Sequence, residues 1–224
     1  MKQWIREQSL SLFFLALFLV TLLGHSIAGQ RAYNAEQLTH DSSSISYWRY
    51  LVSSEYGASV LENWQSEWLQ FMVFAIATVW FVQKGSNESK QVDEAGLESD
   101  QRQRVGGYVD ERSPRWARFR DWRRRIYENS FLLVLTAIFL SSWFVQSLTS
   151  RNEFNADQRE HGEQALSWLD YVENADFWER TLENWQSEFL AVGTMVVFTI
   201  YLRQRGSPES KPVGAPHDET GTSG

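Results

Sequence analysis

The sequence predicts an all-α, polytopic membrane protein with four transmembrane helices, formed by two tandem, parallel two-helix repeats, together with a basic interfacial helix. Three observations predict this fold. Uncharged apolar stretches alternate with polar segments, the phrase Glu-Asn-Trp-Gln-Ser-Glu occurs twice, and arginines interleaved with aromatic residues precede the second half of the chain. The mean hydropathy of −0.39 and the formal charge of −7 are those of a soluble acidic protein, so the distribution of residues decides the class.

The first predicted span covers residues 9–28. This run contains no Asp, Glu, Lys or Arg, and its length is close to the roughly 20 residues that a helix needs to cross a bilayer. A cleaved signal peptide is the alternative, because Lys2 and Arg6 form a basic lead and Ser26–Ala28 resembles a peptidase site. The repeat described next favours a retained span.

An internal repeat relates the two halves of the chain. Shifting the sequence by 121 residues aligns Trp4–Lys90 with Arg125–Lys211 without a gap, and 29 of the 87 aligned positions are identical. Such self-similarity predicts one structural unit used twice. We expect a first repeat over residues 1–90 and a second over 125–211. The third predicted span, 130–148, lies inside the chain, so its counterpart at 9–28 is also expected to be retained.

A short apolar run follows each copy of the repeated phrase, at Glu62–Glu67 and Glu183–Glu188. These runs predict the second and fourth spans, at about 66–83 and 187–203, and their shortness draws the end of each phrase to the edge of the hydrocarbon. One interpretation is a polar seam that joins the two copies by hydrogen bonds, and the other is a site for a proton or cation at Glu67 and Glu188. The residues of this polar seam or ion site are Asn63, Gln65, Glu67, Asn184, Gln186 and Glu188. The interfacial anchors are Trp64, Trp68, Trp178 and Trp185.

The distribution of basic residues predicts the orientation. Sixteen of the 21 Lys and Arg lie in the N-terminal lead, the central segment and the C-terminal tail, which places these parts and both termini in the cytoplasm. The two loops on the opposite side are acidic. Within them, Ser46–Leu51 and Ser167–Val172 each predict a short helix that begins after a serine cap.

The central segment divides into two parts. Residues 91–112 are rich in Ser, Gly, Gln and acidic residues and predict a disordered cytoplasmic linker, as residues 212–224 predict a disordered tail. Residues 113–127 predict one basic amphipathic helix in the membrane interface, with aromatic residues on one face and arginines around it. A topology signal without lipid regulation is an equal alternative. The expected lipid-contacting residues are Arg115, Trp116, Arg118, Arg120, Trp122, Arg123, Arg124 and Arg125.

Enzymatic and metal chemistry find little support in the sequence. The chain has no Cys, no glycine-rich phosphate loop and no convincing triad. His40 and His161 follow Glu36 and Asp157 by four residues, but two ligands in each copy are too few for a metal. We therefore expect no enzyme, no metal and no cofactor. The expected partners are a bilayer with anionic lipids, a further copy of the chain and a protein that no residue identifies, and no nucleic acid is expected.

Three stretches of the second copy resemble a bacterial family of small integral membrane proteins whose function is unassigned. They are Phe154–Gly162, Phe177–Leu190 and Arg203–Lys211, with weaker echoes in the first copy. The resemblance implies a multi-pass protein of the bacterial inner membrane and supplies no activity or catalytic residue. The expected function is non-enzymatic, through protein or lipid contacts in the envelope. The alternative is a small oligomeric unit that conducts or transports protons or cations through Glu67 and Glu188.

Overall fold

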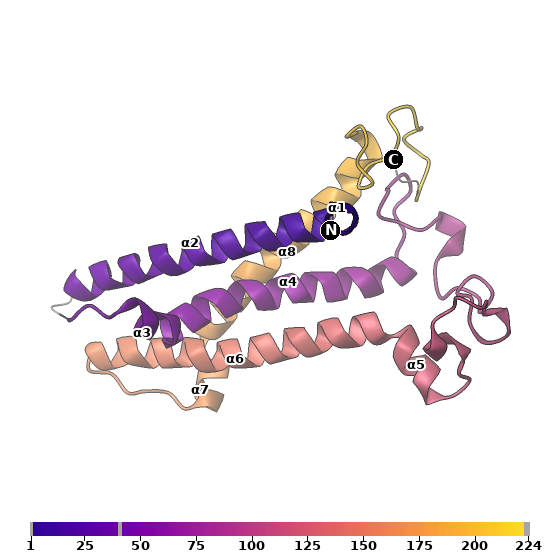
Figure 1. The fold of residues 1–224 in the computed structure, drawn as a ribbon. Helices are drawn as coiled ribbons and strands as arrows, with labels where there is room; N and C mark the ends of the chain where they lie inside the picture. The colour runs from indigo at the N-terminus through magenta and orange to yellow at the C-terminus, as the bar shows by residue number, and fades with distance from the viewer. Residues whose placement is uncertain (1, 40–41, 222–224) are drawn as a thin grey trace. The chain divides into compact units, whose positions relative to one another are not determined.

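The computed structural model describes residues 2–39 and 42–221, and the regular elements of these residues are all helices (Figure 1). These residues contain no β-strand, so the all-α prediction is confirmed. The α-helices are α1 Lys2–Glu7, α2 Ser9–Thr39, α3 Tyr47–Leu51, α4 Ser54–Trp80, α5 Trp122–Glu128, α6 Ser130–Glu160, α7 Trp168–Val172 and α8 Ala175–Tyr201. Three short 3-10 helices lie in the central segment: η1 Val92–Glu94, η2 Gly106–Tyr108 and η3 Arg115–Arg118.

The helices of the two halves correspond in length and position. α2 and α6 each have 31 residues, α3 and α7 each have 5, and α4 and α8 each have 27. α6, α7 and α8 each begin 121 residues after α2, α3 and α4, which is the offset of the sequence match.

The same side chains close the corresponding loops. Asn34 accepts a hydrogen bond from the amide of Ile45 at 2.8 Å and donates one to its carbonyl at 3.0 Å. Asn155 makes the same two bonds with Leu166, at 2.7 and 2.9 Å. Each loop then enters a short helix behind a serine cap, Ser46 before α3 and Ser167 before α7. The two capped helices predicted from the sequence are confirmed.

The chain forms two compact units. One contains Met1–Val60 with Ser147–Leu166, and the other contains Leu61–Gln146 with Ser167–Gly224. α4 and α6 each begin in one unit and end in the other, so the units differ from the sequence repeats at 1–90 and 125–211.

Aromatic residues gather in each unit. In the first, Tyr50 is buried, its ring lies 5.3 Å from that of Tyr56, and Gly29 leaves room for its hydroxyl. In the second unit, Trp143 stacks on Phe139 at 5.6 Å and on Phe177 at 6.0 Å. These clusters bury aromatic ring surface within each unit.

Two of the long helices, α2 and α6, are long and apolar enough to cross a membrane, judged by length and composition. No other helix of the described residues meets both conditions, because α4 and α8 are apolar only in their second halves. Two of the four predicted spans are therefore supported by length and composition, and the spans at α4 and α8 stay predictions. Since α2 lies near the N-terminus, the signal-peptide alternative also stays open.

The basic segment at 113–127 is not the single helix that its spacing predicts. η3 ends at Arg118, the backbone at Phe119 is extended, and α5 begins after Asp121. The Asp121 carboxylate accepts a hydrogen bond from the amide of Arg123 at 3.0 Å, which starts a new helix instead of continuing the first one. Residues 91–112, predicted as a disordered linker, contain turns, η1 and η2. Their disorder in solution stays a prediction.

Candidate functional site

The repeated phrase joins α4 to α8 within the second unit. The side chain of Gln65 is 0% exposed, and its Oε1 accepts a hydrogen bond from the indole Nε1 of Trp185 at 2.9 Å. Beside this contact, the Arg180 guanidinium pairs with the Glu62 carboxylate at 3.1 Å. We call this set of contacts the seam. Each of these contacts joins one residue of the first copy to one residue of the second.

The seam uses the two copies unequally. Gln65 and Ser66 are buried, whereas the equivalent Gln186 and Ser187 are exposed. Trp185 packs against Phe139 and Trp143 of α6, with ring centroids 6.2 and 5.6 Å apart. The remaining residues of the predicted polar set are not gathered into one site: Asn63 and Glu67 are exposed, and Asn184 and Glu188 are partly buried. Among the predicted anchors, Trp64, Trp68 and Trp185 are partly buried, and Trp178 is exposed.

A second set of contacts follows α4 and α8, where the sequence Gly-Ser-x-Glu-Ser-Lys forms a loop in each copy. Gly85 and Gly206 have φ angles of +86° and +83°, a left-handed conformation that favours glycine and turns the chain away from the helix. Ser89 accepts a hydrogen bond from the amide of Gln83 at 2.8 Å, and Ser210 accepts the equivalent bond from Gln204 at 2.9 Å. The repeated sequence therefore forms the same turn five residues after the end of α4 and of α8.

The lysine that ends each loop binds the backbone that follows it. Lys211 is 1% exposed, and its Nζ lies within 2.7–3.0 Å of four carbonyl oxygens, those of Gly85, Pro216, His217 and Glu219. Lys90 binds the carbonyl of Gly96 at 3.1 Å and the carboxylate of Glu98 at 3.2 Å. Each lysine thus fixes a short segment of chain after its loop.

The two loops also contact each other. Lys211 reaches Gly85 of the first loop, and the Asn87 amide donates to the carbonyl of Pro208 at 3.2 Å. The C-terminal segment adds Thr220, whose hydroxyl accepts from the amide of Gly85 at 2.8 Å. The loops, α4 and α8 therefore end in one connected cluster, which we call the loop cluster.

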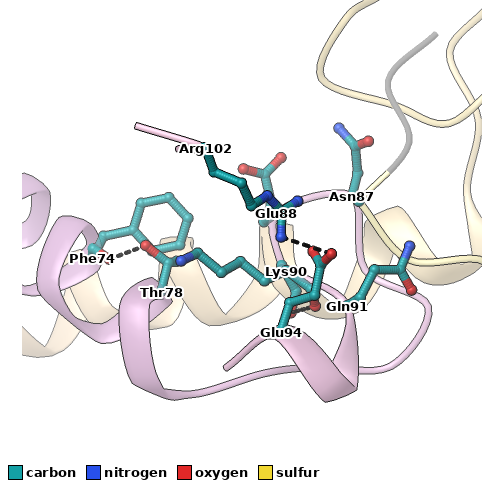
Figure 2. Close-up of a pocket in the computed structure, with 10 residues that line it drawn as sticks. Phe74, Thr78, Asn87, Glu88, Lys90, Gln91, Glu94 and Arg102 are labelled. Carbon is teal, nitrogen blue, oxygen red and sulfur yellow. Dashed lines mark hydrogen bonds and ion pairs between the residues drawn. The ribbon is translucent and has the colours of Figure 1, made fainter. Parts of the chain in front are cut away.

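A pocket of about 650 Å³ adjoins the loop cluster (Figure 2). Its charged lining residues are Glu88, Lys90, Glu94 and Arg102. Arg102 pairs with Glu94 at 2.8 Å, and Lys90 is held by Glu98 as described above. Burial and the nearby negative charge of Glu209 raise the pKa of Glu88. The cations of this pocket are already paired, so it offers no free anion site.

The predicted lipid-contacting residues lie on the surface. Arg115, Trp116, Arg118, Arg120, Trp122, Arg123 and Arg125 are exposed, and Arg124 is partly buried. Three of the arginines are engaged within the protein: Arg118 with backbone carbonyls, Arg124 with Glu128 at 3.0 Å, and Arg123 with Asp121 at 3.9 Å. In the described part of the chain, the guanidiniums of the other three form no hydrogen bond or ion pair.

Within residues 2–39 and 42–221, no group of three or more His, Asp and Glu side chains is arranged to bind a metal. His161 makes an exposed contact with Asp157 at 3.4 Å, and hydrogen bonding to the Asp157 backbone raises the pKa of its imidazole. His40 lies outside the described residues. The role of Lys211 was not predicted from the sequence, although its place in the repeated Gly-Ser-x-Glu-Ser-Lys was the available signal.

Comparison with protein families adds one finding. Residues 1–222 match a family described as "Domain of unknown function (DUF6766)". The chain belongs to the DUF6766 family. No curated protein and no solved structure matches it. Because the DUF6766 match covers both copies, the seam and the loop cluster, all of these features lie within one family domain, and the family description assigns them no activity.

Proposed function

We propose that this DUF6766 protein is a multi-pass protein of the bacterial inner membrane, with α2, α4, α6 and α8 as four spans and both termini in the cytoplasm. Its function is non-enzymatic and operates through protein or lipid contacts in the envelope. The observation that carries this proposal is the exposure of large apolar side chains along all four long helices. Such surfaces are unfavourable in water and are covered in a bilayer.

The exposed apolar residues include those of the two helices with lower hydropathy. On α4 they include Phe71, Ile76 and Trp80, and on α8 they include Leu190, Val197 and Phe198. Each helix has 27 residues and is therefore about 40 Å long, against a hydrocarbon core of about 30 Å. The apolar second half of each helix then lies in the membrane, and the polar first half extends beyond it.

The number of membrane crossings in each repeat decides how the two repeats are oriented. An odd number of crossings in each repeat would invert the second copy, whereas two crossings return the chain to its starting side and give parallel repeats. The excess of Lys and Arg before α2, between α4 and α6, and after α8 supports a cytoplasmic location for these segments.

The basic segment supports contact with anionic lipid. Arg115, Arg120 and Arg125 have no partner among the described residues, and the side chains of Trp116 and Trp122 are exposed beside them. Free guanidiniums next to exposed aromatic rings suit the level of the phosphate headgroups.

The seam supports an assembly role for the repeated phrase. The amide of Gln65 is buried and paired with Trp185, whereas the carboxylate-bearing Glu67 is exposed. A buried and satisfied polar pair fixes the register of two packed helices.

The alternative function is proton or cation transport by an oligomer, through Glu67 and Glu188. One observation favours it: α4 and α8 meet at the level of these two equivalent glutamates, where the side chain of Gln70 donates a hydrogen bond to the backbone carbonyl of Glu188 at 3.5 Å. Paired acidic groups at the membrane edge are typical of ion pathways.

The test measures ion and proton flux into vesicles that hold the purified protein. We expect no flux above empty vesicles for the wild type, and no difference in the double variant Glu67→Gln and Glu188→Gln. Glu183→Gln, at an exposed position of the same phrase, is the matched control. Flux that the double variant abolishes and the control retains would replace the proposal by the transport function. Co-purification of the intact protein from membranes then identifies its protein contacts.

A further inference from the structure

A small cavity between α4 and α8, next to the loop cluster, has the chemistry of a ligand site. It measures about 210 Å³ and is lined by Gln70, Phe71, Phe74, Glu88, Ala191, Val192, Met195 and Glu209. Two aromatic rings, a thioether and two aliphatic side chains form the apolar wall. Its charged lining residues are Glu88 and Glu209, which occupy equivalent positions of the two loops, and both are acidic.

No cation of the described residues pairs with the carboxylates of this cavity, of which Glu88 is partly buried and Glu209 is exposed. The lysine of each loop is committed elsewhere, Lys90 to Glu98 and Lys211 to four backbone carbonyls. Neither Glu88 nor Glu209 forms an ion pair within the described residues. The Oε1 atom of Glu88 is buried and accepts no hydrogen bond there, and the same holds for Oδ1 of the adjacent Asn87. A buried acceptor without a donor is costly, and a ligand that supplies N–H groups and positive charge removes the cost.

We propose that this cavity binds a small organic cation, namely a primary ammonium group on a short apolar body. The ammonium donates hydrogen bonds to Glu88 and interacts with the charge of Glu209. The apolar body contacts Val192, Met195 and the faces of Phe71 and Phe74, which attract a nearby cation. The volume is below the 300–1,000 Å³ typical of pockets for drug-sized ligands, so the body is limited to a few carbon atoms. This site uses the same apolar halves of α4 and α8 that the proposed function places in the membrane, and Glu88 and Glu209 reach them from the loops that follow these helices. Its binding test does not require the four-span topology, so the two proposals can fail separately.

The test is a ligand-detected NMR titration of the full chain, purified in a neutral detergent, with ethyl-, propyl- and butylammonium. We expect the dissociation constant to fall about fourfold for each added methylene, because each buried methylene contributes about 0.8 kcal/mol. The alcohols of equal length, which lack the charge, bind at least about tenfold more weakly. Equal binding of the alcohols and the ammonium ions would overturn the proposal. So would affinity that does not change with chain length together with complete competition by inorganic cations, because the apolar wall would then contribute nothing.

Three variants and one control assign the site. Glu88→Gln weakens butylammonium binding by about tenfold, and Glu209→Gln, at an exposed position, weakens it by about two- to threefold because solvent screens its charge. Val192→Trp fills the cavity, keeps both carboxylates and also removes binding. Glu179→Gln, an exposed position on α8 about 18 Å before the cavity wall, leaves binding unchanged. Circular dichroism checks that each variant is folded, and unchanged binding in all three site variants would exclude this cavity.

A last arm distinguishes the two natural sources of the ammonium group. Phosphatidylethanolamine added to the micelles displaces butylammonium if the site takes a lipid headgroup. Displacement by phosphatidylethanolamine and not by phosphatidylcholine supports a primary ammonium of lipid origin, and no displacement by either lipid supports a soluble amine. Equal displacement by both lipids contradicts a site selective for primary ammonium.

Discussion

Replacing Lys211 by Met should detach the C-terminal segment from the loop cluster. Lys211 is almost completely buried, and its ammonium group binds the carbonyls of Gly85 in the first loop and of residues 216, 217 and 219. Met has a similar length and fills the space without donating hydrogen bonds. The variant therefore removes the donor and leaves several carbonyls without a partner.

The expected effect follows from the number of bonds and from burial. Three N–H groups serve four carbonyls, and hydrogen bonds to a charged group contribute about 1.5–3 kcal/mol each before the cost of burying the ammonium. We expect a net loss of about 3 kcal/mol in local stability, or roughly a hundredfold in the opening equilibrium. The equivalent Lys90 has a side chain that is 25% exposed, with one carbonyl and one carboxylate partner. Lys90→Met should therefore lose about 1 kcal/mol or less.

Hydrogen exchange of the backbone amides, measured on the full chain in detergent, tests this difference. The amides of Gly85 and Gly221, which donate to Thr220 and Ser86, report on the attachment directly. In Lys211→Met both should exchange roughly a hundred times faster, while the middle of α8 keeps its protection. Unchanged exchange at these amides, or a larger effect of Lys90→Met than of Lys211→Met, would refute the reasoning.

Three further predictions concern the seam, the basic segment and the first loop. Gln65→Leu should lower the free energy of unfolding by about 1–3 kcal/mol in chemical unfolding, because it leaves the Trp185 indole without its acceptor. The matched variant Gln186→Leu, at an exposed position, should change it by less than about 0.5 kcal/mol. Equal effects of the two variants would contradict an asymmetric seam. A peptide of residues 113–127 should gain helix on anionic vesicles, and less on neutral vesicles or at high salt, by circular dichroism; equal binding would remove the electrostatic argument. The pKa of Glu88 is raised in the folded state, so the folded protein holds the proton of this carboxyl group more strongly than the unfolded chain does. The free energy of unfolding should therefore fall as the pH rises from the ordinary carboxylate range towards the raised pKa. Glu88→Gln should flatten that slope in thermal unfolding between about pH 4 and 7, and an unchanged slope would assign it to other groups.

The features that the sequence predicted best are local ones. The caps Ser46 and Ser167 and the equal offset of the helices follow from residues near each other in the chain, because capping and periodicity need no distant partner. The single helix expected at 113–127 was wrong because Asp121 caps a second helix inside it, and periodicity alone does not reveal a restart.

The contacts that the sequence did not predict depend on distant partners. Gln65 and Gln186 occupy identical phrases, yet only Gln65 is buried, since only its position faces the Trp185 indole. The burial of Lys211 likewise depends on carbonyls of Gly85, more than a hundred residues earlier. Identical local sequence cannot specify such differences, which come from the packing around each copy.

Labelling of single cysteines tests the four-span topology most directly. The chain contains no Cys, so Ser43→Cys, Leu97→Cys, Gln164→Cys and Val213→Cys each introduce the only thiol, at exposed positions. A membrane-impermeant maleimide applied to spheroplasts should label positions 43 and 164 and leave positions 97 and 213 unlabelled until the membrane is opened. If only α2 and α6 cross the membrane, position 97 is labelled from outside and position 164 is protected, and this result would contradict the parallel four-span repeat.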